Sequence, residues 1–592
     1  MTYQAVQPRA GIFTDQAPAD ASGFYASGSN VRFVQGRAET IGGWQKKTAT
    51  QATGIPRKIK SWAQIDGNIN TGLASASALQ IDQGGTLYDI TPERASGSLT
   101  NPFDTTDTST TVTVNHSSHG LATGARVIFD SASAVGGITI DGEYTATKVD
   151  DNSYTITHSS AATSTVSGGG GSPNYSYLIN PGETNSVYQF GWGIGAWNAE
   201  TWGTARSASD TTLAARIWSL EPWGEDLIAA HNIDGTVYYW DATTGTSVRA
   251  SALSNAPTAS FVMVSPETRH LICFGAGGDP LKIQWCEQDN LTSWTASATN
   301  DAGDQRLVEG SEIRAAIRAR GAIIVLTDVA AYEMSYIGGQ YVWRFRRIGS
   351  TGPVMGVNAI AESDGVVAWI CEDGTFRYYN GSIQTLDCPV RKHVFDNINL
   401  VQRVKVTAGV NASYQEIAWF YPSAGQDEPD KAVVWSYGQG SDVWWLSDDI
   451  DRTAWDAAGV IKTPLGVGSD GYIYEHETGA SADGSNLTAF VETGDVDIQN
   501  GDELYNVGDI IPDMVLQGAD ASNKVNLTLK SRVYPLGDQT TNGPHEIDST
   551  TQKLSGRATG RQIAYRLESA SQNLFWRAGK MRFDVTLNGG TR

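Results

Sequence analysis

Four segments of this chain share one pattern, in which an apolar run, a tight turn and an aromatic-rich run follow one another. The clearest covers residues 223–240, where an Asp-Gly pair separates two runs whose side chains would alternate between two faces. An Asp-Gly pair between alternating runs is a strong signal for a β-hairpin. The pattern returns at residues 365–379 and 465–474, and in a looser form at 78–88. Four related hairpins in one chain predict a repeated structural unit.

The spacing of the turns predicts the size of this unit. The turn glycines are Gly85, Gly235, Gly374 and Gly471. A four-stranded propeller blade takes about 40 to 50 residues, so the intervals between these glycines correspond to nearly two, three and two blades once an insert, described below, is set aside. We therefore predict a mainly β fold built on a β-propeller of roughly six to eight blades.

Composition agrees with a β-rich chain and narrows the functional classes. The 592 residues include 64 glycines, 18 tryptophans and 23 tyrosines, a mixture that favours short strands and tight turns. Acidic side chains outnumber basic ones by 64 to 42, which gives a net charge of −22. This balance argues against tight binding of DNA or anionic membranes by the surface as a whole. It is compatible with DNA that passes by, because acidic walls repel a duplex.

Two regions depart from the repeat. Between about residues 101 and 175, Ser and Thr replace the aromatic residues around four short alternating strands, and a Gly-rich run closes the segment. These features are typical of a small β domain inserted at a loop. From about residue 490, clean alternation predicts a C-terminal antiparallel sandwich or barrel. The predicted domains are residues 1–100 and 176–489 for the propeller, 101–175 for the insert and 490–592 for the C-terminal domain.

Strand patterns at two further places are assigned to the propeller. Val31, Phe33 and Ile41 are strand residues of a hairpin near the beginning of the chain, which Gly42-Gly43 ends. We expect this hairpin to belong to the first part of the propeller. After the insert, residues 187–193 resume the aromatic strand pattern.

The C-terminal region runs against the overall charge of the chain. Its basic residues are a candidate docking face for an acidic protein neighbour: Arg557, Arg561, Arg566, Arg577, Lys580 and Arg582. The alternative is a solvated sheet face, which needs no partner.

Patterns for metal sites and catalysis are incomplete. His116 and His119 could share a metal with His158, but a hairpin surface is the simpler interpretation. The acidic groups at residues 448–451 and 495–503 lack the spacing of a calcium loop. No phosphate loop, serine-hydrolase elbow or sialidase box is complete, and no carboxylate pair for glycoside hydrolysis can be chosen among 64 acidic residues. We predict no enzyme activity, no metal and no cofactor.

Cysteine usage and hydropathy bear on the cellular compartment. The four cysteines match no zinc spacing and are predicted to be buried thiols. The chain starts without a secretory signal and contains no run of 18 apolar residues, so we expect a protein made and folded in a cytoplasm.

Short motifs at both ends carry a resemblance to a known family. Near the beginning they are residues 8–12, 30–33, Gly36, Glu39 and residues 41–44, and near the end residues 560–562, 566–569 and 575–585. Together they resemble the tail-nozzle proteins of short-tailed bacteriophages, also called tail tubular protein B or packaged-DNA stabilisation proteins. The insert, at residues 114–121 and 142–144, is similar to a small β module of many phage tail proteins. The middle of the chain matches this family in architecture only.

The resemblance implies a structural virion protein. It would form a hexamer, a ring below the portal whose axial channel retains packaged DNA and conducts it during ejection. The implied partners are the tail adaptor protein beneath the portal, other tail proteins such as fibres or a needle, passing double-stranded DNA and the host outer surface. The implied location is the virion tail, after synthesis in the host cytoplasm.

Two alternatives remain open. One is a host-surface glycan-binding or depolymerising tail appendage, since Trp and Tyr on propeller loops can stack on sugars. The other is a cellular propeller scaffold unrelated to phage.

Overall fold

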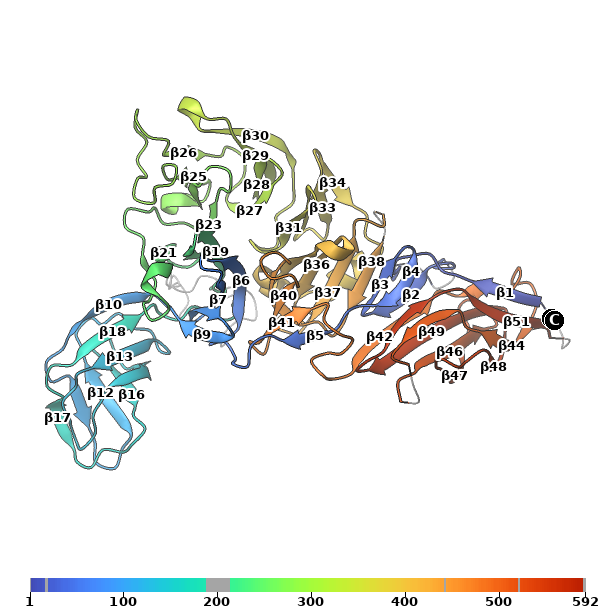
Figure 1. Cartoon of the computed structure of the whole chain (residues 1–592), viewed down its shortest axis with the longest axis horizontal. Coiled ribbons are helices and arrows are strands. Elements are labelled where there is room, and N and C mark those ends of the chain that lie inside the picture. Colours follow the sequence, from blue (N-terminus) through green and yellow to red (C-terminus); the bar gives the residue numbers. More distant parts are fainter. Residues whose placement is uncertain are drawn as a thin grey trace, which may run out of the picture. The chain divides into compact units, whose positions relative to one another are not determined.

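Strands make up most of the regular structure. The computed structural model describes residues 2–15, 17, 20–187, 213–440, 443–519 and 522–588. Within these ranges the only α-helix is α1 (Arg391–Phe395), and no helix is long and apolar enough to cross a membrane. The chain divides into two compact units, Ala52–Leu307 and the combination of Met1–Gln51 with Val308–Arg592. Figure 1 shows the strands of both units.

The unit Ala52–Leu307 contains three four-stranded antiparallel sheets in its described part, and in each sheet the strands pair in chain order. They are β6 (Pro56–Ala63), β7 (Ile69–Ser75), β8 (Leu79–Gln83) and β9 (Thr86–Asp89); β19 (Trp218–Trp223), β20 (Asp226–His231), β21 (Val237–Trp240) and β22 (Ser251–Ala252); and β23 (Phe261–Val264), β24 (Leu271–Phe274), β25 (Lys282–Trp285) and β26 (Gly303–Arg306). The first strands contact one another in succession, β6 with β19 and β19 with β23. Propeller blades are arranged in this way, since each sheet must bury its apolar face against its neighbours.

The second unit contains four more such sheets. They are β27 (Ile313–Ala319), β28 (Ala322–Thr327), β29 (Ala330–Tyr336) and β30 (Trp343–Ser350); β31 (Ile360–Ser363), β32 (Val366–Ile370), β33 (Phe376–Tyr379) and β34 (Ile383–Leu386); β35 (Thr407–Asn411), β36 (Glu416–Tyr421), β37 (Lys431–Ser436) and β38 (Trp444–Ser447); and β39 (Arg452–Asp456), β40 (Leu465–Gly468), β41 (Ile473–His476) and β5 (Trp44–Lys46). The first strands β27, β31, β35 and β39 again contact in succession. The last sheet takes its fourth strand, β5, from the opposite end of the chain.

The described residues thus hold seven blades, and the predicted fold class is confirmed. All four predicted hairpins are present. Three of them, β20–β21, β32–β33 and β40–β41, form the middle strands of their blades, whereas β8–β9 forms the last two strands of its blade. The strand predicted at residues 187–193 lies, after Val187, outside the described residues.

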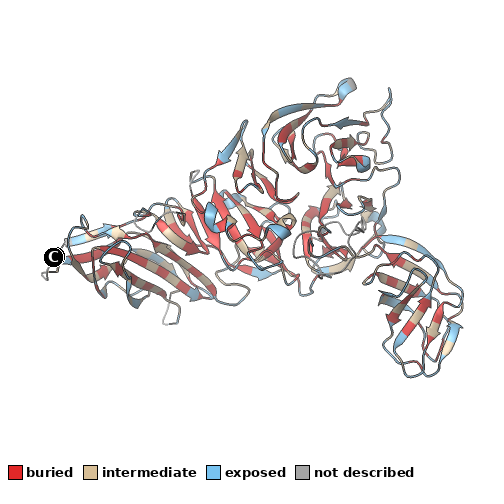
Figure 2. Ribbon diagram, turned by 180° about the vertical axis from the view of Figure 1, so that it is seen from behind, coloured by how far each residue is buried: buried red, intermediate tan, exposed pale blue. Residues whose placement is uncertain are grey.

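Tryptophan side chains fill the space between neighbouring blades. Trp218, which is fully buried, donates its indole N–H to the carbonyl of Ser75 in the preceding blade at 2.7 Å. Trp419 does the same to the carbonyl of Ala359 at 3.1 Å. Each indole thereby buries apolar area and satisfies a backbone acceptor. The buried faces of the strands are visible in Figure 2.

The inserted domain consists of two sheets with their own apolar core. One sheet contains β10 (Glu93–Ser98), β18 (Asn174–Leu178), β13 (Arg126–Asp130) and β14 (Gly142–Thr145), and the other β15 (Thr147–Lys148), β16 (Ser153–Thr157), β12 (Thr111–Asn115), β11 (Phe103–Thr105) and β17 (Val166–Gly169). The four predicted strands are present. The predicted start at residue 101 is too late, because β10 pairs with β18 and belongs to the insert. Nearly every side chain of β10 is exposed, so no apolar alternation reveals this strand.

An ion network joins the base of the insert to the propeller. Arg126 on β13 binds Asp89 at the end of β9, and its Nε lies 2.5 Å from Glu143 on β14. Arg249, which precedes β22, binds Asp89 at 2.8 Å. Burial opposes ionisation of Asp89, but hydrogen bonds from Arg126 and Thr91 and both guanidinium charges outweigh it and lower the pKa of this carboxyl.

Removal of the shared carboxylate should loosen the insert. We expect Asp89→Asn to lower the free energy of unfolding by about 1–3 kcal/mol, because two partly buried arginines lose the negative charge that they share. Limited proteolysis should also cleave the two connections between insert and propeller faster. Asp107→Asn, at an exposed position of the insert, is the matched control. Equal stability and cleavage rates for native chain and Asp89→Asn would contradict this role.

The C-terminal domain is a sandwich, one of the two architectures predicted for it, but it includes strands from the beginning of the chain. One layer contains β2 (Tyr25–Ser29), β42 (Leu487–Thr493), β49 (Gln562–Ser571), β46 (Val525–Arg532) and β47 (Thr540–Ile547), with β43 (Val496–Asp497) beside β49. The other contains β1 (Thr2–Val6), β51 (Met581–Leu587), β44 (Tyr505–Ile511) and β48 (Leu554–Gly560), followed by β3 (Val31–Val34), β4 (Arg37–Thr40), β50 (Phe575–Ala578) and β45 (Met514–Gln517). Tyr565 and Phe583 face each other between the layers, with ring centroids 5.8 Å apart.

The assignment of residues 1–100 to the propeller is therefore wrong for the first part of this range. Strands β1, β2 and β4 pair with C-terminal strands, and β3 joins them through β4, as the blue and red ribbons of Figure 1 show. The hairpin β3–β4 has a buried apolar face, including Phe33, that packs against Tyr25 and the C-terminal core. Only β5 and the blade β6–β9 are propeller strands within residues 1–100.

Candidate functional site: the junction of the chain ends

The two ends of the chain meet in the sheet that contains β3, β4, β50 and β45. In this sheet Glu39 lies opposite Arg32 on one side and opposite Arg577 on the other. Side chains of directly opposed residues lie on the same face of a sheet. Arg32, Glu39 and Arg577, all from segments that carry the family resemblance, thus form one row of charges, which we call the junction row. At one end of the junction row, Glu39 forms an ion pair with the Arg577 guanidinium.

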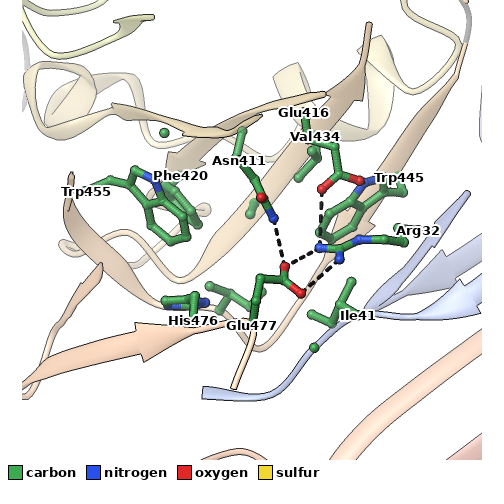
Figure 3. A pocket seen from close by; sticks show the side chains of 15 residues that line it. Arg32, Ile41, Asn411, Glu416, Phe420, Val434, Trp445, Trp455, His476 and Glu477 are labelled. Atoms are coloured by element: carbon green, nitrogen blue, oxygen red, sulfur yellow. Dashed lines mark hydrogen bonds and ion pairs between the residues drawn. The ribbon is translucent and has the colours of Figure 1, made fainter. Parts of the chain in front are cut away.

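Arg32 extends the junction row into the propeller. Its two terminal nitrogens bind both oxygens of Glu477, at 2.9 and 2.5 Å, and one of them lies 3.3 Å from Glu416. Its guanidinium also covers the ring of Tyr414, with 3.7 Å to the ring centroid. Glu416 begins β36 and Glu477 follows β41, so this single side chain connects the sheet of the chain ends to two blades (Figure 3).

The two carboxylates differ in how well they are compensated. Glu477 receives both Arg32 nitrogens and also the amide of Asn411 at 2.8 Å. Glu416 is fully buried and accepts from the Trp445 indole at 2.8 Å. Burial raises the pKa of Glu416 to about 7, although Arg32 opposes the shift. One guanidinium cannot neutralise both carboxylates. Glu477 is only partly buried, so the cost of the uncompensated charge falls on the buried Glu416.

Two glycines of the family-like motif allow this close approach. A Cβ on Gly42 would lie 2.8 Å from the Glu477 Cα, and one on Gly43 would lie 2.5 Å from the Ser481 backbone nitrogen. Any larger residue would displace the β41 end of the last blade. Close packing against the backbone of the last blade therefore requires glycine at both positions of the motif.

The enclosed space beside Arg32 measures about 40 Å³, which is room for water but not for a cofactor. Its walls include Trp455 and His476, and burial holds the pKa of His476 well below its ordinary value. The arrangement is suited to holding three segments together.

The six predicted docking residues do not gather on one face. Arg577 belongs to the junction row. Arg566 follows Tyr565, and Arg582 precedes Phe583; because both aromatic rings face the sandwich interior, the two arginines point out from opposite layers. Arg566 is bound by Glu568 at 2.8 Å and lies over the Phe490 ring.

The other three predicted docking residues lie around the same sandwich. Arg561 donates to the Asp502 carbonyl at 2.9 Å. Arg557 on β48 is exposed, as is Arg582, and Lys580 precedes β51 at an intermediate exposure.

The histidines and acidic groups considered for metal binding have protein partners. His116 bonds the Tyr177 hydroxyl at 2.7 Å, and His119 bonds the Asp150 carbonyl at 2.9 Å. Asp448 binds Lys431 and Asp495 binds Arg532. All four cysteines are buried, as predicted.

Comparisons with known proteins give structural likenesses only. No family model matches the sequence, and no curated protein is significantly similar. Among solved structures, Kluyvelomyces marxianus Hsv2 is similar over 47% of this chain and 71% of that chain, at 10% identity and a TM-score of 0.26. The β-propeller domain of Myceliophteria thermophila Cps50 (Swd1) is similar over 46% of this chain and 88% of that chain, at 9% identity and a TM-score of 0.29. The phage phi92 endosialidase is similar over 80% of this chain and 74% of that chain, at 12% identity and a TM-score of 0.19.

Removal of the central guanidinium should strongly destabilise the junction. We expect Arg32→Ala to cost about 3–5 kcal/mol of unfolding free energy in denaturant titrations, because the buried Glu416 and the partly buried Glu477 lose their cation. Arg37→Ala on the neighbouring strand β4 is the control, expected to change stability by about 0.5 kcal/mol or less. A loss for Arg32→Ala no larger than that of the control would show that the ion pair is dispensable.

Replacement of Glu416 by a neutral residue should raise the free energy of unfolding, whereas Arg32→Ala lowers it, and the gain should depend on pH. The pKa of Glu416 is about 7 in the folded chain against 4.5 ordinarily, so its charge costs stability as the pH rises through this window. Above pH 7, Glu416→Gln should therefore unfold at a higher temperature than the native chain. Its free energy of unfolding should be greater by an amount on the order of 3 kcal/mol. The difference should vanish below pH 4.5.

The matched control for this measurement is Glu475→Gln on β41, where no such pH-dependent gain is expected. A gain for Glu416→Gln that is constant from pH 4 to pH 9 would disprove the electrostatic explanation.

Proposed function

We propose that this chain is the tail-nozzle protein of a short-tailed bacteriophage, a structural virion component that retains packaged DNA and conducts it during ejection. The observation that carries the proposal is the junction row. Glu39 and Arg577, which belong to the two family-like ends, bind each other across 538 residues of chain, and Arg32 links them to the blades. Parts of the motifs from both ends of the chain thus meet in one sheet, which supports their common origin over chance matches.

The charge of the chain fits this role. A net charge of −22 would give a ring of copies an acidic lumen, where a duplex is repelled from the wall and can slide. We propose a hexamer beneath the portal, in contact with the tail adaptor protein and with other tail proteins such as fibres or a needle. This role needs no catalysis, metal or cofactor in the chain itself.

Localisation on intact particles tests the proposal. An antibody against the inserted domain, residues 93–178, should label the tail axis directly below the portal in electron micrographs. Particles assembled without this chain are the control; they should lack the label and lose their DNA after packaging. Label on lateral appendages would instead support the glycan-binding alternative, and particles that keep their DNA without this chain would remove the retention role.

A further inference from the structure

A hollow of about 480 Å³ with a mixed polar and apolar lining lies in the unit Ala52–Leu307, between the first two blades. Its walls come from four connections at one end of these sheets: β6–β7, β8–β9, β19–β20 and the segment after β21. This volume is within the range of about 300–1,000 Å³ typical of small-molecule sites. The hollow is separate from the junction row and has no part in the proposed nozzle function.

The walls of the hollow are held in place before any ligand arrives. The Trp62 indole donates to the Glu225 carbonyl at 2.6 Å, and the Ile65 amide donates to the Glu225 carboxylate at 3.3 Å. Asp66 fixes the β6–β7 loop by accepting from the backbone and side chain of Asn68 at 2.9 and 2.7 Å. A preformed site avoids the entropy cost of ordering loops on binding.

Several polar groups in the walls retain unused hydrogen-bonding capacity. Gln64 accepts from Gln83 through its oxygen, and within the described residues no group accepts from its amide nitrogen. The second oxygen of the Glu225 carboxylate and the Thr246 hydroxyl likewise have no protein partner in the described part of the chain. An amide donor, a carboxylate acceptor and a hydroxyl together match the donor and acceptor pairs of a polyol.

The charge of the hollow selects among ligands. Its described lining contains the carboxylates of Asp66 and Glu225 and neither lysine nor arginine. Phosphates, sialic acids and uronates would be repelled, because the described lining offers no cation to compensate their charge. The described residues also contain no group of three His, Cys, Asp or Glu side chains that could hold a metal ion. Ile65, with 94% of its surface exposed, adds an apolar contact at the rim for the C–H face of a sugar ring.

We infer that this hollow is a binding site for an uncharged oligosaccharide, with Gln64, Glu225 and Thr246 as its hydrogen-bonding residues. The site is independent of where the chain sits in a particle, so the proposed function and this inference can fail separately.

Purified full-length chain should be applied to an array of neutral, sialylated and uronate-containing oligosaccharides, followed by titration calorimetry of the bound ones. We expect retention of neutral oligosaccharides only. Gln64→Leu and Thr246→Val should each weaken binding about three- to tenfold, the loss of one hydrogen bond. Gln288→Leu and Thr295→Val, at exposed positions in the third blade region, are matched controls and should leave binding unchanged.

Thermal unfolding of each variant checks that the fold is intact. Thr246→Val is nearly isosteric, so a loss of binding at an unchanged unfolding midpoint would support a direct contact. Absence of binding to any oligosaccharide, preference for the acidic ones, or equal binding by native chain and both hollow variants would each overturn the inference. Calcium binding at the hollow without sugar binding would overturn it as well.

Discussion

A guanidinium can be buried only if hydrogen-bond acceptors replace its water, and at Arg32 carboxylates from two blades do so, which ties the chain ends to the propeller. Strand β3 carries Arg32 into contact with Glu416 and Glu477, which belong to two different blades. The same strand pairs with β4 and, through it, with the C-terminal strand β50. One residue therefore couples the sandwich to the last two blades. The glycines that follow let the chain turn directly into β5, which completes the last blade.

Local signals made much of the fold predictable. A hairpin with an Asp-Gly turn is specified within about 15 residues, so the blades around residues 223–240 and 465–474 could be expected from sequence. The partner of a strand is not specified locally. Residues 31–41 were correctly predicted as a hairpin, but the strand beside it comes from residues 575–578 at the other end of the chain. The polar strand β10 shows the complementary problem, because an exposed strand has no apolar face for sequence to reveal.

The candidate site was less predictable than the fold. A count of basic residues near the C-terminus suggested one docking face, yet alternation along β49 and β51 directs Arg566 and Arg582 to opposite surfaces. Arg577 forms an ion pair with Glu39, which lies within the first 40 residues of the chain, so its partner could not be found near the C-terminus. One sequence signal was available at Glu416, which begins the buried run Glu416–Tyr421. A carboxylate at the head of an apolar strand requires a partner, although the sequence does not say that Arg32 provides it.

The insert and the hollow occupy opposite ends of the same blade, which follows from strand direction. The hollow includes Gln83, where β8 passes into β9, whereas the insert leaves the blade beyond Asp89, at the other end of β9. Because the insert begins after the last strand of this blade and ends before β19, it interrupts no hydrogen-bonded pair of either sheet. The ion network around Asp89 then fixes the base of the insert on the side away from the hollow. A ligand would therefore reach the hollow without displacing the inserted domain.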